Sequence, residues 1–436
     1  MTLSAYQMQT NTKICYSNHK NSPELKNEYG SLNNLLKIVM TEGYNEQVVQ
    51  SASLDPVSNI AKLILDLDHG FNKDVVVEIT STDAEGLTGE FRILSKDLAE
   101  VEIFIPETLR SKTLTNLTIK IAPLGYSIAF EDLDKGVLCL ANTSRIPFIL
   151  KSIDSLPPND YAPTWSKFSR VVIGQKLDIL GEFVNEEKAP YHPDYPQSEK
   201  TGNGIKGSGG IHGFAKWDYV MRSDSYEFAE NKTVFGVYPT DWKIIGDSKT
   251  FYLMIRPLGR NNRSYNVLSF GEYTSYNPEE FKNACLTARD DFSSAESIVS
   301  ANFARTRQCF GVLESSYTGF ILSDIYGNIK NTVDYNRFRN AGAYFSGTEF
   351  NRPWKSPDIN SIHPITGEIF LEKLYIMDRQ NFLRGFHRGM TICYGEDRFA
   401  NENPTSAGIF SISVQEPNTT STYLEMPIIF YMGDWD

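Results

Sequence analysis

The stretch Val75-Val-Val-Glu-Ile79 is the first of four similar runs, the others being Gly89-Glu-Phe-Arg-Ile93, Val101-Glu-Ile-Phe-Ile105 and Leu117-Thr-Ile-Lys-Ile121. Aliphatic and aromatic residues alternate with polar ones in each run, as in strands that bury one face. Turn-forming residues, notably those at 83–89, separate the runs. Short strands at this spacing predict a small β-sandwich over residues 47–122.

The residues that follow this module keep the same β character. Short apolar runs alternate with turn-rich loops, of which the longest lie at 185–212 and 330–366. We therefore predict a larger β-rich domain over residues 123–436. The expected strands are 136–140, 148–153, 170–180, 242–255, 266–270, 319–322, 368–377, 391–394, 408–414 and 424–432. Pro278 and the two glutamates after it favour a short helix over 278–286.

One amphipathic helix is expected near the N-terminus. Its apolar positions follow helical spacing, with a candidate N-cap at Ser31 and a left-handed stop at Gly43; the positions are Leu32, Leu35, Leu36 and Val39. The polar residues 16–30 before it look like an extended arm. The segment 2–27 has few apolar residues, so we expect it to contribute no core and to contact neighbouring subunits or other components of an assembly. The alternative is a tail that lies over its own domain.

These patterns give a mainly β, multi-domain fold with three parts. An N-terminal arm and helix cover residues 1–46, the small β-sandwich module covers 47–122 and the larger β-rich domain covers 123–436. A length of 436 residues exceeds what one ordinary core supports, which favours this division.

Composition excludes some functions and leaves others open. The net charge is −12 and no basic run occurs, so we expect no direct binding of duplex DNA. Aromatic residues make up 12% of the sequence, which suits both a β-rich core and extensive subunit interfaces. No apolar segment is long enough to span a bilayer, so membrane insertion is not expected, and no secretory signal is evident.

The five cysteines are widely spaced and form no CxxC motif. An odd number without such pairs argues against a disulfide framework or a zinc site, and favours reduced, mostly buried thiols in a protein made in a cytoplasm. They are Cys15, Cys139, Cys285, Cys309 and Cys393.

Two short sequence motifs resemble ligand-binding sites, but neither has the neighbouring elements or residues that such a site requires. Gly202-Asn-Gly204-Ile-Lys-Gly207 matches GxGxxG, but a dinucleotide site needs a preceding strand and a following helix. A proline-rich stretch precedes it and more glycines follow, so we interpret it as a flexible loop. Asp66-Leu-Asp68 begins like a calcium loop, but Phe71 and Val77 occupy the positions that require Gly and Glu.

No catalytic chemistry emerges from the remaining polar residues. The histidines lack metal-ligand spacing, and the paired carboxylates at 186–187, 279–280 and 290–291 are adjacent, so in strands they would point to opposite faces. The histidines are His19, His69, His192, His212, His363 and His387. We therefore expect a protein that is not an enzyme, with no catalytic, cofactor-binding or metal-binding residues and no cofactor.

Six motifs occur in an order that resembles a known family. They are Gly30-Ser-Leu-Asn-Asn-Leu-Leu36, His69-Gly70-Phe71 with Leu87-Thr-Gly-Glu-Phe91, Ala122-Pro-Leu-Gly-Tyr126, Trp242-Lys-Ile-Ile-Gly-Asp247, Ser269-Phe-Gly-Glu-Tyr273 and Leu383-Arg-Gly385-Phe386. With these the sequence resembles a family of bacteriophage virion structural proteins, associated with the tail or neck, that carry an N-terminal GSLxxLL helix and an inserted HGF-type β module.

This resemblance implies a structural protein of the viral tail, neck (collar) or baseplate. Its partners would be further copies of itself, as a homo-oligomer, and other phage tail or neck proteins, and its location would be the virion after synthesis in the bacterial host cytoplasm. Three other functions stay open: a receptor- or glycan-binding tail module, a capsid decoration protein and, less in keeping with the residues, a polysaccharide depolymerase.

Overall fold

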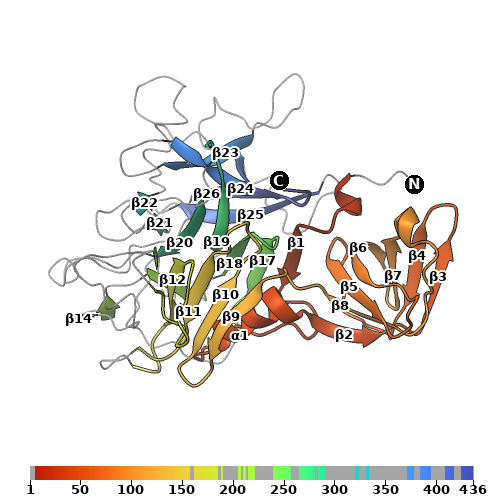
Figure 1. Ribbon diagram of the computed structural model, residues 1–436, viewed down its shortest axis with the longest axis horizontal. Helices are drawn as coiled ribbons and strands as arrows, with labels where there is room; N and C mark the ends of the chain where they lie inside the picture. The colour runs from red at the N-terminus through yellow and green to blue at the C-terminus, as the bar shows by residue number, and fades with distance from the viewer. Residues whose placement is uncertain are drawn as a thin grey trace.

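Two large groups of strands and a separate two-stranded sheet of β14 and β15 make up the described part of the protein (Figure 1). The fold is mainly β, with 50% strand and 8% helix, as the sequence predicted. The computed structural model describes residues 5–157, 162–184, 188–189, 205–207, 210–212, 215–220, 239–256, 265–277, 279, 283–289, 320–323, 330–332, 371–377, 383–393, 408–416 and 424–435.

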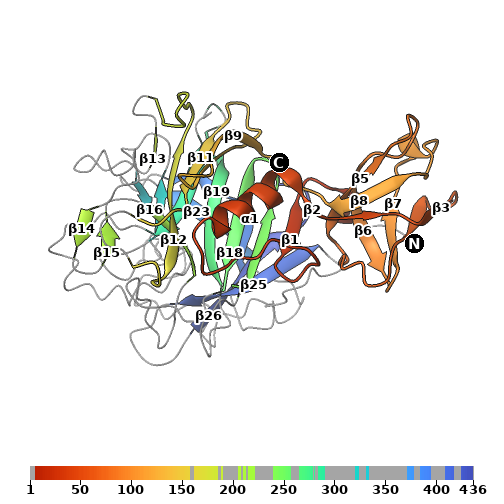
Figure 2. The same cartoon turned by 90° about the horizontal axis from the view of Figure 1, so that it is seen from below.

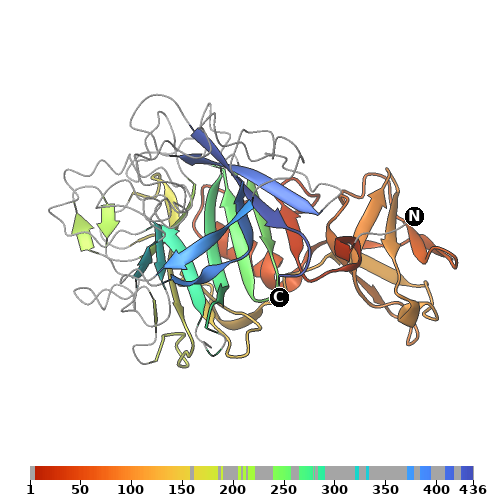
Figure 3. The same cartoon turned by 90° about the horizontal axis from the view of Figure 1, so that it is seen from above.

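The smaller group, the β module, spans residues 44–121 and stands to one side of the molecule in all three overall views (Figures 1–3). Its strands lie in the order β2-β8-β5-β6-β7-β4-β3. Their bounds are β2 Tyr44–Val48, β3 Ser51–Asp55, β4 Ile60–Ile64, β5 Val76–Ser81, β6 Gly89–Lys96, β7 Glu100–Phe104 and β8 Leu117–Ile121, with a short 3-10 helix, η3, at Glu107–Leu109.

Two bent strands join the two sheets of the module into a closed sandwich. β6 pairs with β5 as far as Arg92 and with β7 from Ile93 onward. On the opposite side β2 runs directly into β3, because the Val49 amide bonds to β8 and the Gln50 amide bonds to β4. Alternate residues of the strands fill the interior, so the predicted β-sandwich is confirmed.

The larger group, called the body, is one continuous sheet of strands from both ends of the sequence. Pairings run from β9 through β10, β11, β12, β16, β20, β19, β18 and β17 to β1. The bounds are β1 Lys13–Tyr16, β9 Ser127–Asp132, β10 Val137–Ala141, β11 Ile149–Ile153, β12 Lys167–Gly174, β16 Ala215–Val220, β17 Trp242–Gly246, β18 Thr250–Ile255, β19 Asn266–Ser275 and β20 Ala284–Arg289.

The C-terminal strands extend this sheet from β19. β24 pairs with β19, β23 and β26, and β25 pairs with β26, so that these strands cross over the body in Figure 3. The remaining bounds are β13 Lys188–Ala189, β14 Ile205–Gly207, β15 Gly210–His212, β21 Phe320–Ser323, β22 Lys330–Thr332, β23 Leu371–Met377, β24 Leu383–Cys393, β25 Ile409–Glu416 and β26 Leu424–Tyr431.

Three local expectations for the body are wrong. The strand expected over 242–255 is a hairpin of β17 and β18, because Asp247 supports a turn by accepting the amides of Lys249 and Thr250. Of the helix expected over 278–286, residues 284–286 belong instead to strand β20, and 278 and 280–282 lie outside the described residues. The strand expected over 170–180 ends at Gly174, and a separate hairpin follows it.

The N-terminal helix forms, but not with the expected cap. α1 spans Ser31–Lys37 and continues as a π-helical turn, η2, over Ile38–Glu42, with Leu32, Leu35, Leu36 and Val39 buried. Gly30 is the N-cap residue, whereas the Ser31 hydroxyl accepts the Lys26 amide. Gly43 ends the helix at φ 75°, where its missing Cβ avoids the Ile121 carbonyl.

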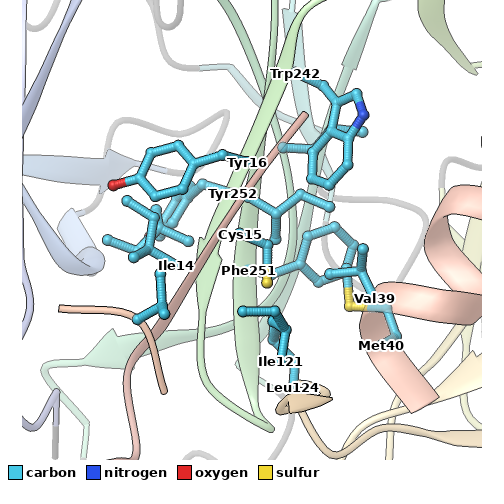
Figure 4. Packing of buried hydrophobic residues seen from close by; sticks show 14 of the residues in the cluster. Ile14, Cys15, Tyr16, Val39, Met40, Ile121, Leu124, Trp242, Phe251 and Tyr252 are labelled. Atoms are coloured by element: carbon cyan, nitrogen blue, oxygen red, sulfur yellow. The ribbon is translucent and has the colours of Figure 1, made fainter. Parts of the chain in front are cut away.

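The N-terminal segment is part of the core, and the expectation that it contributes none is wrong. A 3-10 helix, η1, at Ala5–Met8 precedes β1, which pairs with β17 over its whole length. Ile14 and Cys15 are buried in a cluster that includes residues from η2, β17 and β18 (Figure 4). Leu25 is also buried and bridges to Thr240. This segment therefore cannot be separated from the body as a free arm.

Candidate functional site

The β module meets the body at a buried arginine. Arg92 of β6 is only 2% exposed. Its side chain donates to the carbonyl oxygens of Gln9 (3.0 Å), Asp74 (2.6 Å), Thr12 (2.8 Å) and Met432 (3.2 Å). The fixed fork of a guanidinium suits such converging acceptors. One side chain of the module thus holds both the N-terminal and the C-terminal segments of the protein.

Charged and aromatic groups surround this arginine. Burial lowers the pKa of Arg92 to about 10, so it stays protonated at neutral pH. The Tyr6 ring centre lies 5.9 Å from the guanidinium, and the Tyr6 hydroxyl donates to the Asp74 carboxylate at 3.2 Å. Burial raises the pKa of Asp74 and, with the nearby Asp74 charge, that of Tyr6 to about 12. The junction is a charge-assisted hydrogen-bond network.

Further contacts tie the two terminal segments to each other and to the module. The Thr12 hydroxyl donates to the Gly433 carbonyl, and the Asp434 amide donates to the Gln9 side chain at 3.0 Å. The Lys13 ammonium, nearly buried, donates to the Glu90 carboxylate of β6 and to the Pro123 carbonyl. Four sequence segments therefore converge beside β6.

The His69-Gly70-Phe71 motif supports the module near the body. The His69 ring accepts the Phe71 amide at 3.0 Å and bonds to the Asp97 carbonyl at 2.8 Å. Gly70 has a φ of 75°, and a Cβ there would collide with Lys20. Phe71 is fully buried. The motif thus acts structurally, as a turn that packs against the N-terminal segment.

A buried carboxylate caps helix α1 from a distant strand. Asp154, which follows β11, accepts the amides of Leu32 (2.9 Å) and Asn33 (3.2 Å). The Tyr219 hydroxyl donates to its other oxygen at 2.7 Å. Burial raises the pKa of Asp154 to about 6 although these donors oppose the shift. The carboxylate fixes the helix on the sheet where no local residue provides a cap.

An ordered turn on the body exposes two large aliphatic side chains. Residues 175–184 fold back over β10 to β12, and Phe183 packs there with Cys139 and Ile149. At the tip, Ile179 is 93% exposed and Leu180 is 69% exposed.

Hydrogen bonds hold this turn in place. The Asp178 carboxylate accepts the amides of Leu180 and Glu182, each at 2.9 Å, and the Lys151 ammonium donates to the Gly181 carbonyl at 2.8 Å. The two exposed aliphatic side chains are therefore carried by a backbone that is already ordered.

The structure describes part of the GxGxxG motif and the whole turn that resembles the start of a calcium loop. Of the GxGxxG stretch, Ile205–Gly207 forms β14, which pairs with β15 at Gly210–His212, so a strand and not a helix follows it. Gly202 to Gly204 lie outside the described residues. Asp66 and Asp68 are exposed in the turn region before Val75.

The histidines and carboxylates do not gather into a site in the described part of the protein. His19, His69 and His387 are buried on separate elements, and the structure gives only the backbone of His212; His192 and His363 lie outside the described residues. Of the carboxylate pairs, Glu279 is exposed, whereas Glu280, 186–187 and 290–291 lie outside.

Neither a metal site nor a membrane-spanning helix is found among the described residues. They contain no group of three or more His, Cys, Asp or Glu side chains placed to hold a metal ion. None of their helices has the length and apolarity needed to cross a bilayer. Cys15, Cys139 and Cys285 are buried free thiols, and burial raises the pKa of both Cys15 and Cys139 to about 12.

No protein-family model matches this sequence, and no curated protein is significantly similar to it.

The residues that organise the junction, the cap and the turn, namely Arg92, Asp154 and Asp178, do not stand out in the sequence. Each is a single polar residue in or beside a strand, and its partners, or those of the turn it supports, lie in other segments.

Acidification is expected to destabilise the protein through buried histidines. Burial lowers the pKa of His19 and of His387 to about 3, below the ordinary histidine value of 6.5. Their contribution to stability is present above about pH 6.5 and is lost as the pH falls toward 3. Asp154 works in the opposite direction, because its raised pKa costs stability as the pH rises from 3.8 to about 6.

Burial also raises the pKa of Asp74, so two histidines act against two carboxylates. The free energy of unfolding should still fall with pH between about pH 6 and 4.5, by no more than about 2 kcal/mol per pH unit. Urea titrations at several pH values measure this slope. His19→Gln, which can retain the hydrogen bond to Tyr44, should reduce the slope by up to about 1.4 kcal/mol per pH unit. An unchanged slope in this variant would show that His19 is already protonated in the folded protein.

Proposed function

We propose that this protein is a structural component of a bacteriophage virion, in the tail, the neck or collar, or the baseplate. It acts by symmetric assembly with further copies of itself and with neighbouring virion proteins, and it carries out no catalysis. The phage context rests on the six ordered sequence motifs. The assembly role rests chiefly on the exposed turn at residues 178–181.

The turn supports subunit contact because of its exposure and its order together. Ile179 and Leu180 are largely exposed on their own subunit, although each would gain about 1.5–3 kcal/mol from full burial. Asp178 has already fixed the backbone, so less conformational entropy is lost when a neighbour covers the pair. In a symmetric ring one such contact is reused by every subunit.

Antibody or tag labelling of the protein on intact particles tests the proposal. Label on the tail, the neck or the baseplate is expected. Label on the head alone would contradict it and would favour a capsid decoration protein. Release of oligosaccharides from host polysaccharide by the purified protein would contradict the non-catalytic role.

Charge placed on the exposed turn is expected to block assembly without unfolding the subunit. Ile179→Asp combined with Leu180→Asp should weaken self-association by at least about 10-fold, because an apolar contact is replaced by buried charge. Sedimentation velocity measures the association, and thermal melting of the dilute subunit checks its fold.

A second turn provides a matched control. Val57 is 90% exposed at the tip of the β3–β4 hairpin, and the Asp55 carboxylate accepts its amide at 2.9 Å. Val57→Asp therefore adds a charge to a turn of similar construction on the β module. Equal loss of association in both variants would indicate a general charge effect and would contradict a contact at residues 178–181.

A further inference from the structure

The β module is attached to the body by one narrow two-stranded neck. The backbone enters through Gly43 and Tyr44 and leaves through residues 121–123, and Tyr44 pairs directly with Ile121. Both covalent connections therefore lie side by side. Hydrogen bonds near the neck, such as that from the Asn21 side chain to Asn45 at 3.3 Å, come from the same side of the module.

The Arg92 junction lies away from this neck. At the body end of the module, Tyr44 pairs with Ile121, Ile121 with Val77 and Val77 with Phe91, the residue before Arg92. With neighbouring strands about 4.8 Å apart, Arg92 lies roughly 14 Å from β2. The module therefore also meets the body away from its covalent neck, at Arg92. Between these two places Lys13 of the body donates to both Glu90 and Pro123, and Lys20 donates to the Asp68 carbonyl.

The two terminal segments of the protein make the contact with the module at Arg92. Gln9 and Thr12 precede β1, and Met432 follows β26, the last strand. These segments bond to Arg92 and to each other, and Tyr6 reaches Asp74 of the module. They belong to the body, because β1 and β26 are strands of its sheet.

We propose that residues 5–13 and 432–434 form a latch that closes the β module against the body on Arg92, and that opening this latch leaves the module free to turn about its neck. The module keeps its own fold when the latch opens, because its two sheets close on each other through β6 and the β2–β3 strand. The position of the module therefore depends on whether both terminal segments stay bound to Arg92.

The test uses the full-length protein with Arg92→Met, Arg92→Lys and the matched control Arg110→Met. Arg110 also belongs to the β module and donates to a backbone carbonyl, that of Pro56, but it is exposed and its partner is in the module itself. Lysine retains the charge but lacks the fork of donors, so Arg92→Lys should give an intermediate result.

Hydrogen exchange reports the latch and the module separately. The Asp434 amide, bonded to Gln9, should exchange on the order of 10–100-fold faster in Arg92→Met, as expected for the loss of charge-assisted hydrogen bonds. The amides of β5 and β8 should stay protected. Calorimetry should show one transition for the unaltered protein and for Arg110→Met, and separate module and body transitions for Arg92→Met.

Two results would overturn the proposal. If Arg92→Met and Arg110→Met exchange and melt alike, the guanidinium does not hold the module. If β5 and β8 lose protection together with Asp434, Arg92 is required for the module to fold and does not act as a latch. Small-angle scattering adds a check on shape, since an opened latch should broaden the distribution of maximum dimensions relative to Arg110→Met.

Discussion

Replacing Asp154 by alanine is expected to lower the free energy of unfolding by about 3–5 kcal/mol, as for other broken buried charge networks. The substitution leaves the amides of Leu32 and Asn33 without their buried acceptor, whereas the Tyr219 hydroxyl keeps the Glu28 carbonyl as an acceptor. Each such donor costs about 1–3 kcal/mol when it stays desolvated. Chemical denaturation monitored by tryptophan fluorescence measures the change.

The control is Asp55→Ala, which removes a carboxylate that also accepts a backbone amide but is exposed to water. Its cost should stay near or below about 1 kcal/mol, because water replaces the lost acceptor. Asp154→Asn keeps an oxygen acceptor and should fall between the two. Similar costs for Asp154→Ala and Asp55→Ala would mean that α1 does not depend on this cap.

Deleting residues 2–16 is expected to abolish the folded state of the protein. The deletion removes β1, so β17 keeps only β18 as a partner strand and the core loses Ile14, Cys15 and Tyr16. Burial of each such side chain contributes about 1.5–3 kcal/mol. Their sum approaches the roughly 5–15 kcal/mol that typically separates folded from unfolded domains.

Circular dichroism and thermal melting of the purified variant measure this effect. Deletion of residues 2–4 alone, which spares η1 and β1, is the control and should melt like the full-length protein. If the variant lacking residues 2–16 melts normally and only fails to enter particles, the segment acts between subunits, and its place in the body's core does not stabilise the fold.

Sequence patterns identified the elements that have strong periodicity. The four alternating runs of the β module are β5, β6, β7 and β8, and the apolar stripe from Leu32 to Val39 is helical. Both patterns are local, because they follow from which face of a short segment is buried. The mainly β class follows from the same runs.

Elements whose burial depends on distant partners were missed. The polar strand Ser51–Asp55 has a weak pattern and is held by its pairing with β4. The segment 13–16 is only four residues long and is buried at every position, so it shows no alternation that would indicate a strand, and its burial depends on β17 and on the C-terminal strands. Arg92 and Asp154 could not be recognised as organising residues, since their partners are up to 340 positions away.

The single neck has a mechanical consequence. Tension that pulls the β module away from the body enters both β2 and β8 at the same end, where Tyr44 pairs with Ile121. Load applied in this way acts on one strand-pairing hydrogen bond at a time and peels the ladder open, instead of shearing all its bonds together. The contacts of Arg92 lie three strands across from β2 and share that load. Because the peptide links do not break, resistance to separation of the two parts is set mainly by the Arg92 contacts and the two terminal segments, and only secondarily by the β2–β8 ladder at the neck.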